Sequence, residues 1–345
     1  MTTIQDPAIP KGSAVLVTGV NGFIGSHVAD QFLQLGFRVR GTVRDVKKNA
    51  WVAEFFDKTY GSDRFELVAV PDISVVVADI MSIGISAVIH VASDVSLDPD
   101  PNKVIPTAVD STLNALKTAN DEPTVKRFVI TSSSLAASLP NLGTEVIVTK
   151  DSWNEQAIRA ARADPPYLPE RSEAVYAASK ALAEKAAWNF YHDDPSKRSD
   201  LIVNTVLPCA NFGKILDVDK QGYPSTAGIV ERLWSGKNVE HIASIPPHYA
   251  IDVQDCARLH VAAAIHPGVV GERIFAYGQR FNYDVILDIF RKRNPGRDFI
   301  SNFQSEWDLA VIEPQARTEQ LLRDLGRQGF TPLEESVRLN MEALS

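Results

Sequence analysis

The chain has 345 residues, of which 45% are hydrophobic and 23% charged, and its formal net charge is −8 at pH 7. The length corresponds to about two average domains, and the composition excludes intrinsic disorder, collagen and coiled coil. The negative charge argues against nucleic acid as the main partner, because phosphate binding favours a basic surface. A local basic pocket for one phosphate remains compatible with it.

Compartment and metal content follow from simple features of the sequence. Cys209 and Cys256 are too few for a disulfide framework or a structural zinc site, and the histidines show no metal-ligand spacing. The chain begins without a basic segment followed by an apolar one, and its apolar runs are too short to cross a bilayer. We therefore expect a cytoplasmic protein with no metal, no membrane contact and no nucleic acid partner.

Short β-branched segments alternate with helical patterns along most of the chain. Residues 1–12 lack periodicity and predict a loose arm. Strands are expected at 14–18, 38–43, 65–70, 87–91, 127–131, 201–207 and 273–277. Helices are expected from Phe23 to Gly36, over 47–60, 102–120, 173–191, 226–233 and 253–265, and through most of the tail from Asn282. This alternation favours a parallel sheet with right-handed crossovers.

The rhythm changes after Pro208, where glycines and prolines become frequent. We therefore expect a doubly wound α/β nucleotide-binding domain and a smaller, mostly C-terminal substrate-binding lobe. The predicted domain comprises 11–207 and about 250–277, and the predicted lobe comprises about 208–249 and 278–345. The conformation of residues 74–86 stays open, because valine and isoleucine are frequent where a helix is expected.

A glycine-rich turn directly follows the first expected strand. Gly19, Gly22 and Gly25 stand in the spacing TGxxGxxG. The first glycine permits a tight turn, the second lets backbone N–H groups approach a pyrophosphate, and the third allows a helix to pack closely on a strand. The helix N-terminus adds its partial positive charge. A turn built of small residues for structural reasons is the alternative, but the flanking strand and helix favour a dinucleotide site.

The end of the second expected strand indicates which dinucleotide binds. An acidic residue at this place holds the ribose 2′-OH of NAD, whereas a basic residue suits the 2′-phosphate of NADP. Arg44 stands here, and a guanidinium group can bind a phosphate with two parallel hydrogen bonds. We therefore favour NADPH. Asp45 keeps NAD open, and a solvated turn is the structural alternative.

Tyr176 and Lys180 are one helical turn apart, so the phenol and the ammonium share a face of the expected helix. An ammonium nearby favours the phenolate and lowers the pKa of tyrosine, which is about 10 in the free residue. Tyr176 could then pass a proton to a carbonyl oxygen, while Lys180 binds the nicotinamide ribose. Such a pair alone also occurs on ordinary helix surfaces.

A serine triplet follows the expected strand 127–131, at the carboxyl end where α/β sheets bind ligands. A serine hydroxyl at this edge can donate to a substrate carbonyl oxygen and polarise it. A serine-rich turn is the alternative. The glycine turn, the serine and the tyrosine–lysine pair in this order are far more specific than any one of them.

The order of these motifs resembles that of the extended short-chain dehydrogenase/reductases. The motifs are TGVNGFIG, HVAS at 90–93, RFVITSS at 127–133, YAASK at 176–180 and DVQDCARLHVAA at 252–263. Within that family the chain looks closest to the fungal and yeast NADPH-dependent aldehyde and ketone reductases, with plant dihydroflavonol reductases as more distant relatives. The resemblance runs from about Pro10 to the last helix and implies a Rossmann-type fold.

The resemblance also implies roles for individual residues. Ser133 corresponds to the family's carbonyl-binding serine, Tyr176 to its proton donor and Lys180 to the partner of that tyrosine. The implied cofactor contacts are Gly19, Asn21, Gly22, Phe23, Ile24, Gly25, Arg44, Lys48, Asp72, Ile73, Val91, Ala92, Ser93, Tyr176, Lys180, Pro208, Ser225 and Thr226.

Five residues are candidate walls of a substrate pocket, each equally compatible with ordinary packing or loop exposure: Asp94, Val95, Leu135, Phe212 and His248. The predicted activity is NADPH-dependent reduction of aldehydes or ketones, keto esters included, to alcohols, by a monomer or homodimer. One alternative is an NAD-dependent nucleotide-sugar epimerase or dehydratase, against which Arg44 argues. The other is a non-catalytic NADP-sensing protein, which would not need the serine, tyrosine and lysine together.

Overall fold

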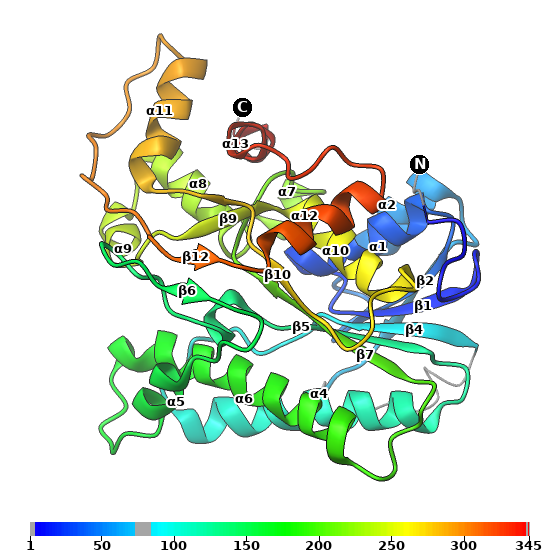
Figure 1. The fold of residues 1–345 in the computed structure, drawn as a ribbon. Helices are drawn as coiled ribbons and strands as arrows, with labels where there is room; N and C mark the ends of the chain where they lie inside the picture. Colours follow the sequence, from blue (N-terminus) through cyan, green and yellow to red (C-terminus); the bar gives the residue numbers. More distant parts are fainter. Residues whose placement is uncertain (1–3, 73–83, 343, 345) are drawn as a thin grey trace.

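The structure, a computed structural model, describes residues 4–72, 84–342 and 344. A seven-stranded parallel sheet in the order β10-β7-β5-β4-β1-β2-β3 forms its centre (Figure 1). The strands are β1 (Ala14–Thr18), β2 (Arg38–Val43), β3 (Phe65–Ala69), β4 (Ile85–His90), β5 (Arg127–Thr131), β7 (Ile202–Pro208) and β10 (Arg273–Ala276). The strand order reverses between β1 and β4, which is where doubly wound sheets bind ligands. The predicted Rossmann-type fold is confirmed.

Helices cover both faces of this sheet (Figure 1). One layer contains α1 (Phe23–Gln34), α2 (Ala50–Tyr60), α10 (Val253–Ile265) and α12 (Gln315–Asp324). The other contains α4 (Pro101–Asp121), α5 (Glu155–Ala161) and α6 (Ser172–Asp193). Because both faces are covered, the central strands are continuous apolar runs, and Val15, Leu16 and Val17 are all buried.

A smaller lobe lies beside the sheet, at the upper left of Figure 1. Its three-stranded sheet has the order β11-β9-β8, and its core contains Phe212, Leu233, Phe281 and Phe290. The elements are β8 (Ala210–Phe212), α7 (Val218–Gln221), α8 (Ala227–Ser235), α9 (Val239–Ala243), β9 (Tyr249–Asp252), β11 (Gln279–Arg280), α11 (Tyr283–Arg293) and α13 (Leu333–Met341). The predicted boundaries between domain and lobe stay a prediction.

Residues 4–12 are packed against the domain, contrary to the expectation of a loose arm over 1–12, of which residues 1–3 lie outside the described residues. Ile9 is fully buried, and the backbone N–H of Ala8 donates a hydrogen bond to the carbonyl oxygen of Ile265 at 2.8 Å. Burial of one isoleucine side chain contributes about 1.5–3 kcal/mol, enough to fix a short segment that shows no periodicity.

Several short elements carry no local signal and were not expected. Two pairs of residues far apart in the chain, β6 (Ile147–Val148) and β12 (Val311–Ile312), form a small parallel sheet. The 3₁₀ turns η1 (Ser134–Ala136) and η2 (Pro169–Arg171) also belong here. Ile73 and most of the segment 74–86 lie outside the described residues, and its last two residues belong to β4.

None of the helices in the described ranges has the combined length and hydropathy needed to cross a bilayer. In the same ranges, no group of three or more His, Cys, Asp or Glu side chains is arranged to hold a metal ion.

Candidate functional site

Most of the predicted site residues lie at the carboxyl edge of the central sheet. Gly19 follows β1, Val91 follows β4, Ser133 follows β5 and Pro208 ends β7. Because parallel strands end at the same edge, these four loops meet there. The first of them opens α1, whose N-terminus carries the partial positive charge of a helix.

The glycine turn packs directly on the loop that follows β4. Gly19 has a φ of 70°, and a Cβ atom added there would lie 3.1 Å from the Cα of Ala92. The Thr18 hydroxyl oxygen accepts hydrogen bonds from the backbone N–H groups of Val91 (3.0 Å) and Ala92 (2.9 Å). This threonine therefore fixes the two loops that the sequence assigns to the diphosphate and the ribose.

The N-terminus of α1 is suited to an anion. Gly22 is its N-cap, has an exposed backbone, and no side chain caps the first N–H groups of the helix. Uncapped N–H groups and the helix dipole together form a binding site for phosphate groups. The turn therefore fits a dinucleotide on its geometry as well as its spacing.

Gly25 provides a sharp test of this turn, because a Cβ atom there would lie 2.2 Å from the carbonyl oxygen of Gly19. Replacing Gly25 with alanine should destabilise the fold by about 1–3 kcal/mol, since the turn must move to make room. Thermal melts with and without NADPH should show a lower Tm and a smaller stabilisation by the cofactor. Gly296→Ala is the matched control, because nothing lies within 4 Å of its added Cβ. Equal melts for the two variants would contradict the prediction.

The predicted 2′-phosphate site lies at the carboxyl end of β2. Arg44 and Lys48 are exposed there, and Asp72 is exposed beyond the end of the neighbouring strand β3. One carboxylate oxygen of Asp45 accepts a hydrogen bond from the Lys48 backbone N–H at 3.1 Å. Asp45 thus serves the turn that leads to α2, while the Arg44 guanidinium faces solvent.

The structure places Ser133, Tyr176 and Lys180 together. Ser133 is the N-cap of η1, and its hydroxyl oxygen accepts a hydrogen bond from the Leu135 backbone N–H at 3.2 Å. A hydrogen bond also joins the Ser133 and Tyr176 side chains. The Lys180 ammonium lies 5.9 Å from the centre of the Tyr176 ring and donates to the carbonyl oxygen of Thr131 at 3.3 Å.

The electrostatics of Tyr176 differ from the expectation. Burial raises the pKa of the phenol, and the hydrogen bond with Ser133 opposes that rise only in part. Ser133, and not Lys180 as expected, is the neighbour that lowers this pKa, and burial lowers the pKa of Lys180 itself to about 8. A phenol with a raised pKa holds its proton at neutral pH, which suits a group that donates it.

Thr226 and Ser225, two further cofactor candidates, lie in the loop that leads to α8. Thr226 donates its hydroxyl proton to the Asn211 carbonyl oxygen (2.8 Å) and accepts from the Asn211 N–H (2.9 Å). Only one acceptor position of that hydroxyl is left for a ligand. Ser225 is exposed with a φ of 51°, a strained conformation for a residue with a side chain.

The residues predicted to line the substrate pocket differ in burial: one is fully buried and the other four are exposed or half-buried. Phe212 is wrong as a wall, because it is fully buried and packs edge-on against Phe281, with ring centres 5.0 Å apart. Val95 is 67% exposed, and Asp94 and Leu135 are half-buried. His248 is half-buried, and burial lowers its pKa to about 4, so its imidazole is neutral.

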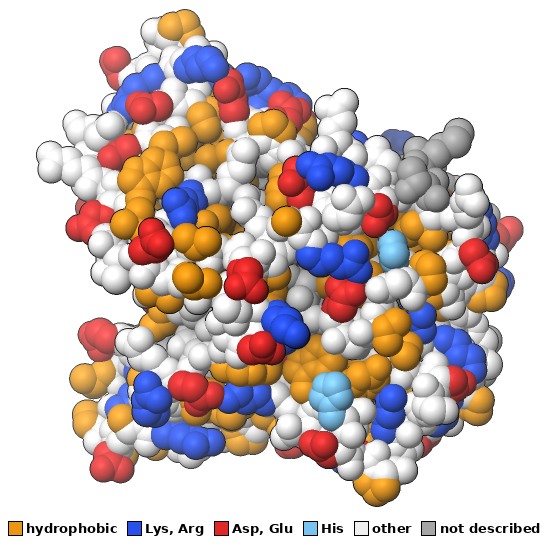
Figure 2. Space-filling view, viewed as in Figure 1, with side chains coloured by type: hydrophobic (Ala, Val, Ile, Leu, Met, Phe, Trp, Pro, Cys, Tyr) orange, Lys and Arg blue, Asp and Glu red, His pale blue; other side chains and the backbone are white. Residues whose placement is uncertain are grey.

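Figure 2, drawn in the orientation of Figure 1, shows a notch at the left of the outline. The notch separates the layer of α5 and α6 from the lobe that contains α8, α9 and α11. The helix that carries Tyr176, α6, belongs to the lower of these two layers. The predicted division of labour, with cofactor on the sheet and substrate against the lobe, is compatible with this shape.

Sequence reasoning missed two residues that join parts of the site. The Gln221 side-chain amide donates to the Asn21 carbonyl oxygen (3.3 Å) and the Ser26 hydroxyl (3.1 Å), which connects α7 to the glycine turn. Glu184 is buried one turn after Lys180. The sequence could have indicated Glu184 only by its spacing, because a carboxylate four residues after Lys180 lies on the same face of α6.

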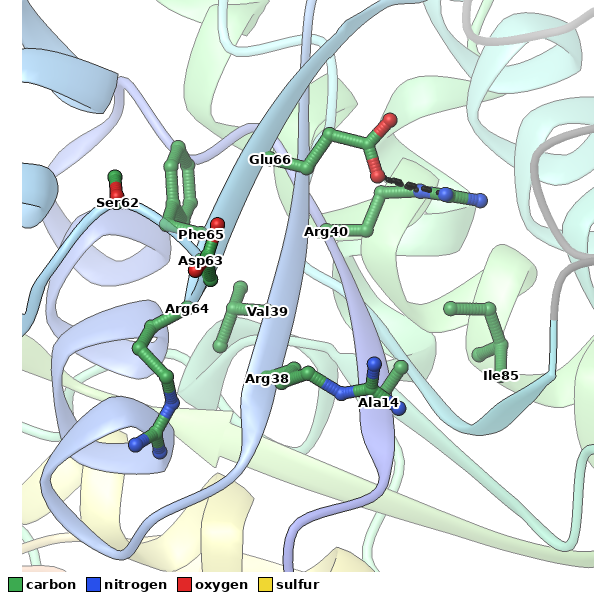
Figure 3. A pocket seen from close by; sticks show the side chains of 10 residues that line it. All are labelled: Ala14, Arg38, Val39, Arg40, Ser62, Asp63, Arg64, Phe65, Glu66 and Ile85. Carbon is green, nitrogen blue, oxygen red and sulfur yellow. Dashed lines mark hydrogen bonds and ion pairs between the residues drawn. The ribbon is translucent and has the colours of Figure 1, made fainter.

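A second hollow, of about 340 Å³, lies at the opposite edge of the sheet, where β1 to β4 begin (Figure 3). Three arginines line it. Arg40 is paired with Glu66 at 2.7 Å, and Arg38 and Arg64 point in different directions. These guanidinium groups do not converge on one ligand position.

The family is decided by comparison with known proteins. Residues 15–276 match the model of the NAD dependent epimerase/dehydratase family. The chain belongs to this family. It is 37% identical over 344 residues to NAD-dependent epimerase/dehydratase terH of Aspergillus terreus, with 99% of each chain covered. It is 36% identical over 341 residues to aldehyde reductase 2 of Sporidiobolus salmonicolor, with 98% of each chain covered.

Comparison of the fold with solved structures leads to reductases as well. A crystal structure of Gre2 from Candida albicans in complex with NADPH superposes with a TM-score of 0.80 and 24% identity, over 97% of this chain and 98% of that chain. The resemblance to extended short-chain reductases is confirmed. Through aldehyde reductase 2 the chain falls among the oxidoreductases of the family.

Proposed function

We propose that the protein is an NADPH-dependent carbonyl reductase that converts aldehydes or ketones, keto esters among them, to alcohols. The observation that carries the proposal is the meeting of Ser133, Tyr176 and Lys180 at the sheet edge that holds the glycine turn. The similarity to aldehyde reductase 2, a relative 36% identical over 98% of the chain, supports it.

The cofactor fits this chain through three features. The uncapped N-terminus of α1 and the Gly19–Gly25 turn would hold the diphosphate. Arg44 would bind the 2′-phosphate, since its guanidinium is exposed and the neighbouring Asp45 is occupied by its own turn. Lys180 would hydrogen-bond the nicotinamide ribose. When bound, NADPH supplies the hydride that reaches the carbonyl carbon.

The residues of the chain then divide the remaining work. The Ser133 hydroxyl donates a hydrogen bond to the carbonyl oxygen of the substrate and polarises it. The Tyr176 hydroxyl, which keeps its proton at neutral pH, donates that proton as negative charge develops on the oxygen. Holding the substrate carbonyl in register with these two hydroxyls contributes a further part of the rate.

The direct test is NADPH oxidation by the purified protein, followed by absorbance, against a panel of aldehydes, α- and β-keto esters and aryl ketones. NADH is tested in parallel. We expect turnover with NADPH and with at least one carbonyl class. Silence of a folded protein that binds NADPH would overturn the proposal.

A second candidate is a nucleotide-sugar epimerase or dehydratase. The observation that favours it is the similarity to NAD-dependent epimerase/dehydratase terH of Aspergillus terreus. Such an enzyme would retain NAD through purification and convert a nucleotide sugar without consuming cofactor. Analysis of the cofactor released on denaturation separates the two candidates.

The buried lysine gives the proposed reductase a pH dependence. Because burial lowers the pKa of Lys180 to about 8, the ammonium is present below that pH and is lost as the pH rises through it. We therefore expect kcat/KM for carbonyl reduction to fall above about pH 8. The measurement is a pH profile in overlapping buffers, with Tm recorded at each pH as the control for unfolding. A flat profile up to pH 10, near the usual lysine pKa of about 10.4, would contradict the assignment.

A further inference from the structure

Glu184 lies one helical turn after Lys180 on α6, and its side chain is fully buried. A buried carboxylate is costly unless it is paired and hydrogen-bonded, and this one is both. Its partners come from three strands or their ends and from its own helix. They are Ser132 Oγ (2.6 Å), Thr205 Oγ1 (2.8 Å), Trp188 Nε1 (3.2 Å), and Arg273 Nε (2.8 Å) and Nη2 (3.4 Å).

The contact with Ser132 reaches the catalytic turn. Ser132 directly precedes Ser133 and follows β5, whereas Tyr176 and Lys180 belong to α6. The 2.6 Å hydrogen bond from Ser132 to Glu184 therefore connects the loop that presents the serine to the helix that presents the other two groups. In the part of the chain that the structure describes, Glu184 forms no hydrogen bond or ion pair with Ser133 or Tyr176, so it acts on them through neighbours.

Arg273 holds the carboxylate in a fixed direction. Its side chain is 9% exposed, and its guanidinium also donates to the carbonyl oxygens of Lys150 (2.7 Å) and Ser152 (2.8 Å). The guanidinium stacks 3.8 Å from the centre of the Trp153 ring. An arginine with this many partners has little freedom, so the ion pair with Glu184 is rigid.

Glu184 and Lys180 line the same small cavity, together with Ser132 and Thr131. The titratable groups that face Lys180 are Tyr176 and Glu184 from α6 and His90 from β4, while α4 contributes only Ala108 and Thr112 to the cavity. Burial lowers the pKa of His90 to about 4, so this imidazole is neutral. Glu184 is the group that raises the pKa of Lys180 against the effect of burial.

We propose that Glu184 is a positioning residue of the site: its hydrogen bond orients the Ser132–Ser133 turn, and its negative charge attracts the Lys180 ammonium across the cavity that both side chains line. The inference rests on the proposed reductase function. The alternative is an ion pair that only stabilises the packing of α6 on the sheet. The two roles differ in their effect on the titration of Lys180.

Two substitutions separate the effect of the Glu184 charge from the effect of its side-chain length. Glu184→Gln keeps the size and the acceptor for Ser132 but removes the charge, so the alkaline limb of kcat/KM should move to lower pH and kcat should fall about tenfold. Glu184→Asp keeps the charge but shortens the side chain, so kcat should fall while the limb stays in place. Ser132→Ala should resemble Glu184→Asp. Glu155→Gln, which removes a surface ion pair with Lys185, is the control and should match the wild type.

The second readout needs no turnover. A carbon-NMR titration of labelled lysine side chains, with the Lys180 signal assigned by its loss in Lys180→Met, should give a lower Lys180 pKa in Glu184→Gln than in the wild type. If Glu184→Gln does not fold, the test rests on Glu184→Asp and Ser132→Ala. A shift of the alkaline limb of kcat/KM in either of these variants contradicts the assigned roles. If the variants fold and neither kcat nor titration changes, the inference is overturned. A wild type that reduces no carbonyl would overturn the proposed function instead.

Discussion

Replacement of Tyr176 by phenylalanine is expected to lower kcat for carbonyl reduction by about 10²- to 10⁴-fold, the range that general acid catalysis contributes. The variant loses one hydroxyl, and the ring keeps its place on α6. NADPH affinity should therefore change little. The measurement is single-turnover reduction by NADPH, with cofactor affinity obtained by fluorescence titration of the same samples.

Tyr191→Phe is the matched control for this substitution. Tyr191 is partly buried near the other end of α6, so loss of its hydroxyl tests the general cost of the change to the helix. Its activity should equal that of the wild type. If Tyr176→Phe retained activity within a few fold of the wild type, the proton would have to come from another group. If neither the wild type nor Tyr176→Phe reduced a carbonyl, the non-catalytic alternative would gain support.

The expected size of this effect depends on the environment of the phenol. The sequence shows that Tyr176 and Lys180 share a helix face, but it does not show how deeply either group is buried. Burial is set by α4, α5 and η1, which pack against α6, and it raises the pKa of Tyr176. Reduction requires a proton donor, so a protonated phenol suits the proposed direction better than the phenolate that spacing alone suggests.

Local patterns were sufficient for the sheet and for the motifs of the candidate site, whose roles stay predictions. The strands of the central sheet are β-branched runs with both faces buried, so periodicity and length identify them. The glycine turn, the serine triplet and the tyrosine–lysine pair are each contiguous in sequence. Their meeting at one edge follows from the parallel arrangement of the strands, which the alternation of strands and helices predicts.

Features that depend on distant residues could not be predicted. Phe212 is an apolar residue near the site, and only its contact with Phe281 shows that it belongs to the core of the lobe. The pairing of β6 with β12 joins two-residue segments more than 160 residues apart, so no local pattern marks it. Glu184 is an ordinary helix residue in sequence, since its partner Arg273 arrives from β10.

Replacement of Arg44 by alanine is expected to raise KM for NADPH by about 10- to 100-fold and to leave KM for NADH unchanged. A hydrogen bond to a charged group contributes about 1.5–3 kcal/mol, and each 1.4 kcal/mol corresponds to a factor of ten. Only NADPH carries the 2′-phosphate, so only its binding should suffer. Steady-state kinetics with both cofactors at a fixed carbonyl concentration provide the measurement.

Lys47→Ala is the control for the Arg44 substitution, because Lys47 is an exposed cation in the same turn that is not assigned to the phosphate. Asp45 provides the competing explanation. Its carboxylate oxygen accepts the Lys48 N–H at 3.1 Å, and a carboxylate committed to its turn is poorly placed to bind a ribose 2′-OH. Preference of the wild type for NADH would show that Asp45 leaves this turn to bind the ribose, and Arg44 would then have no phosphate to hold.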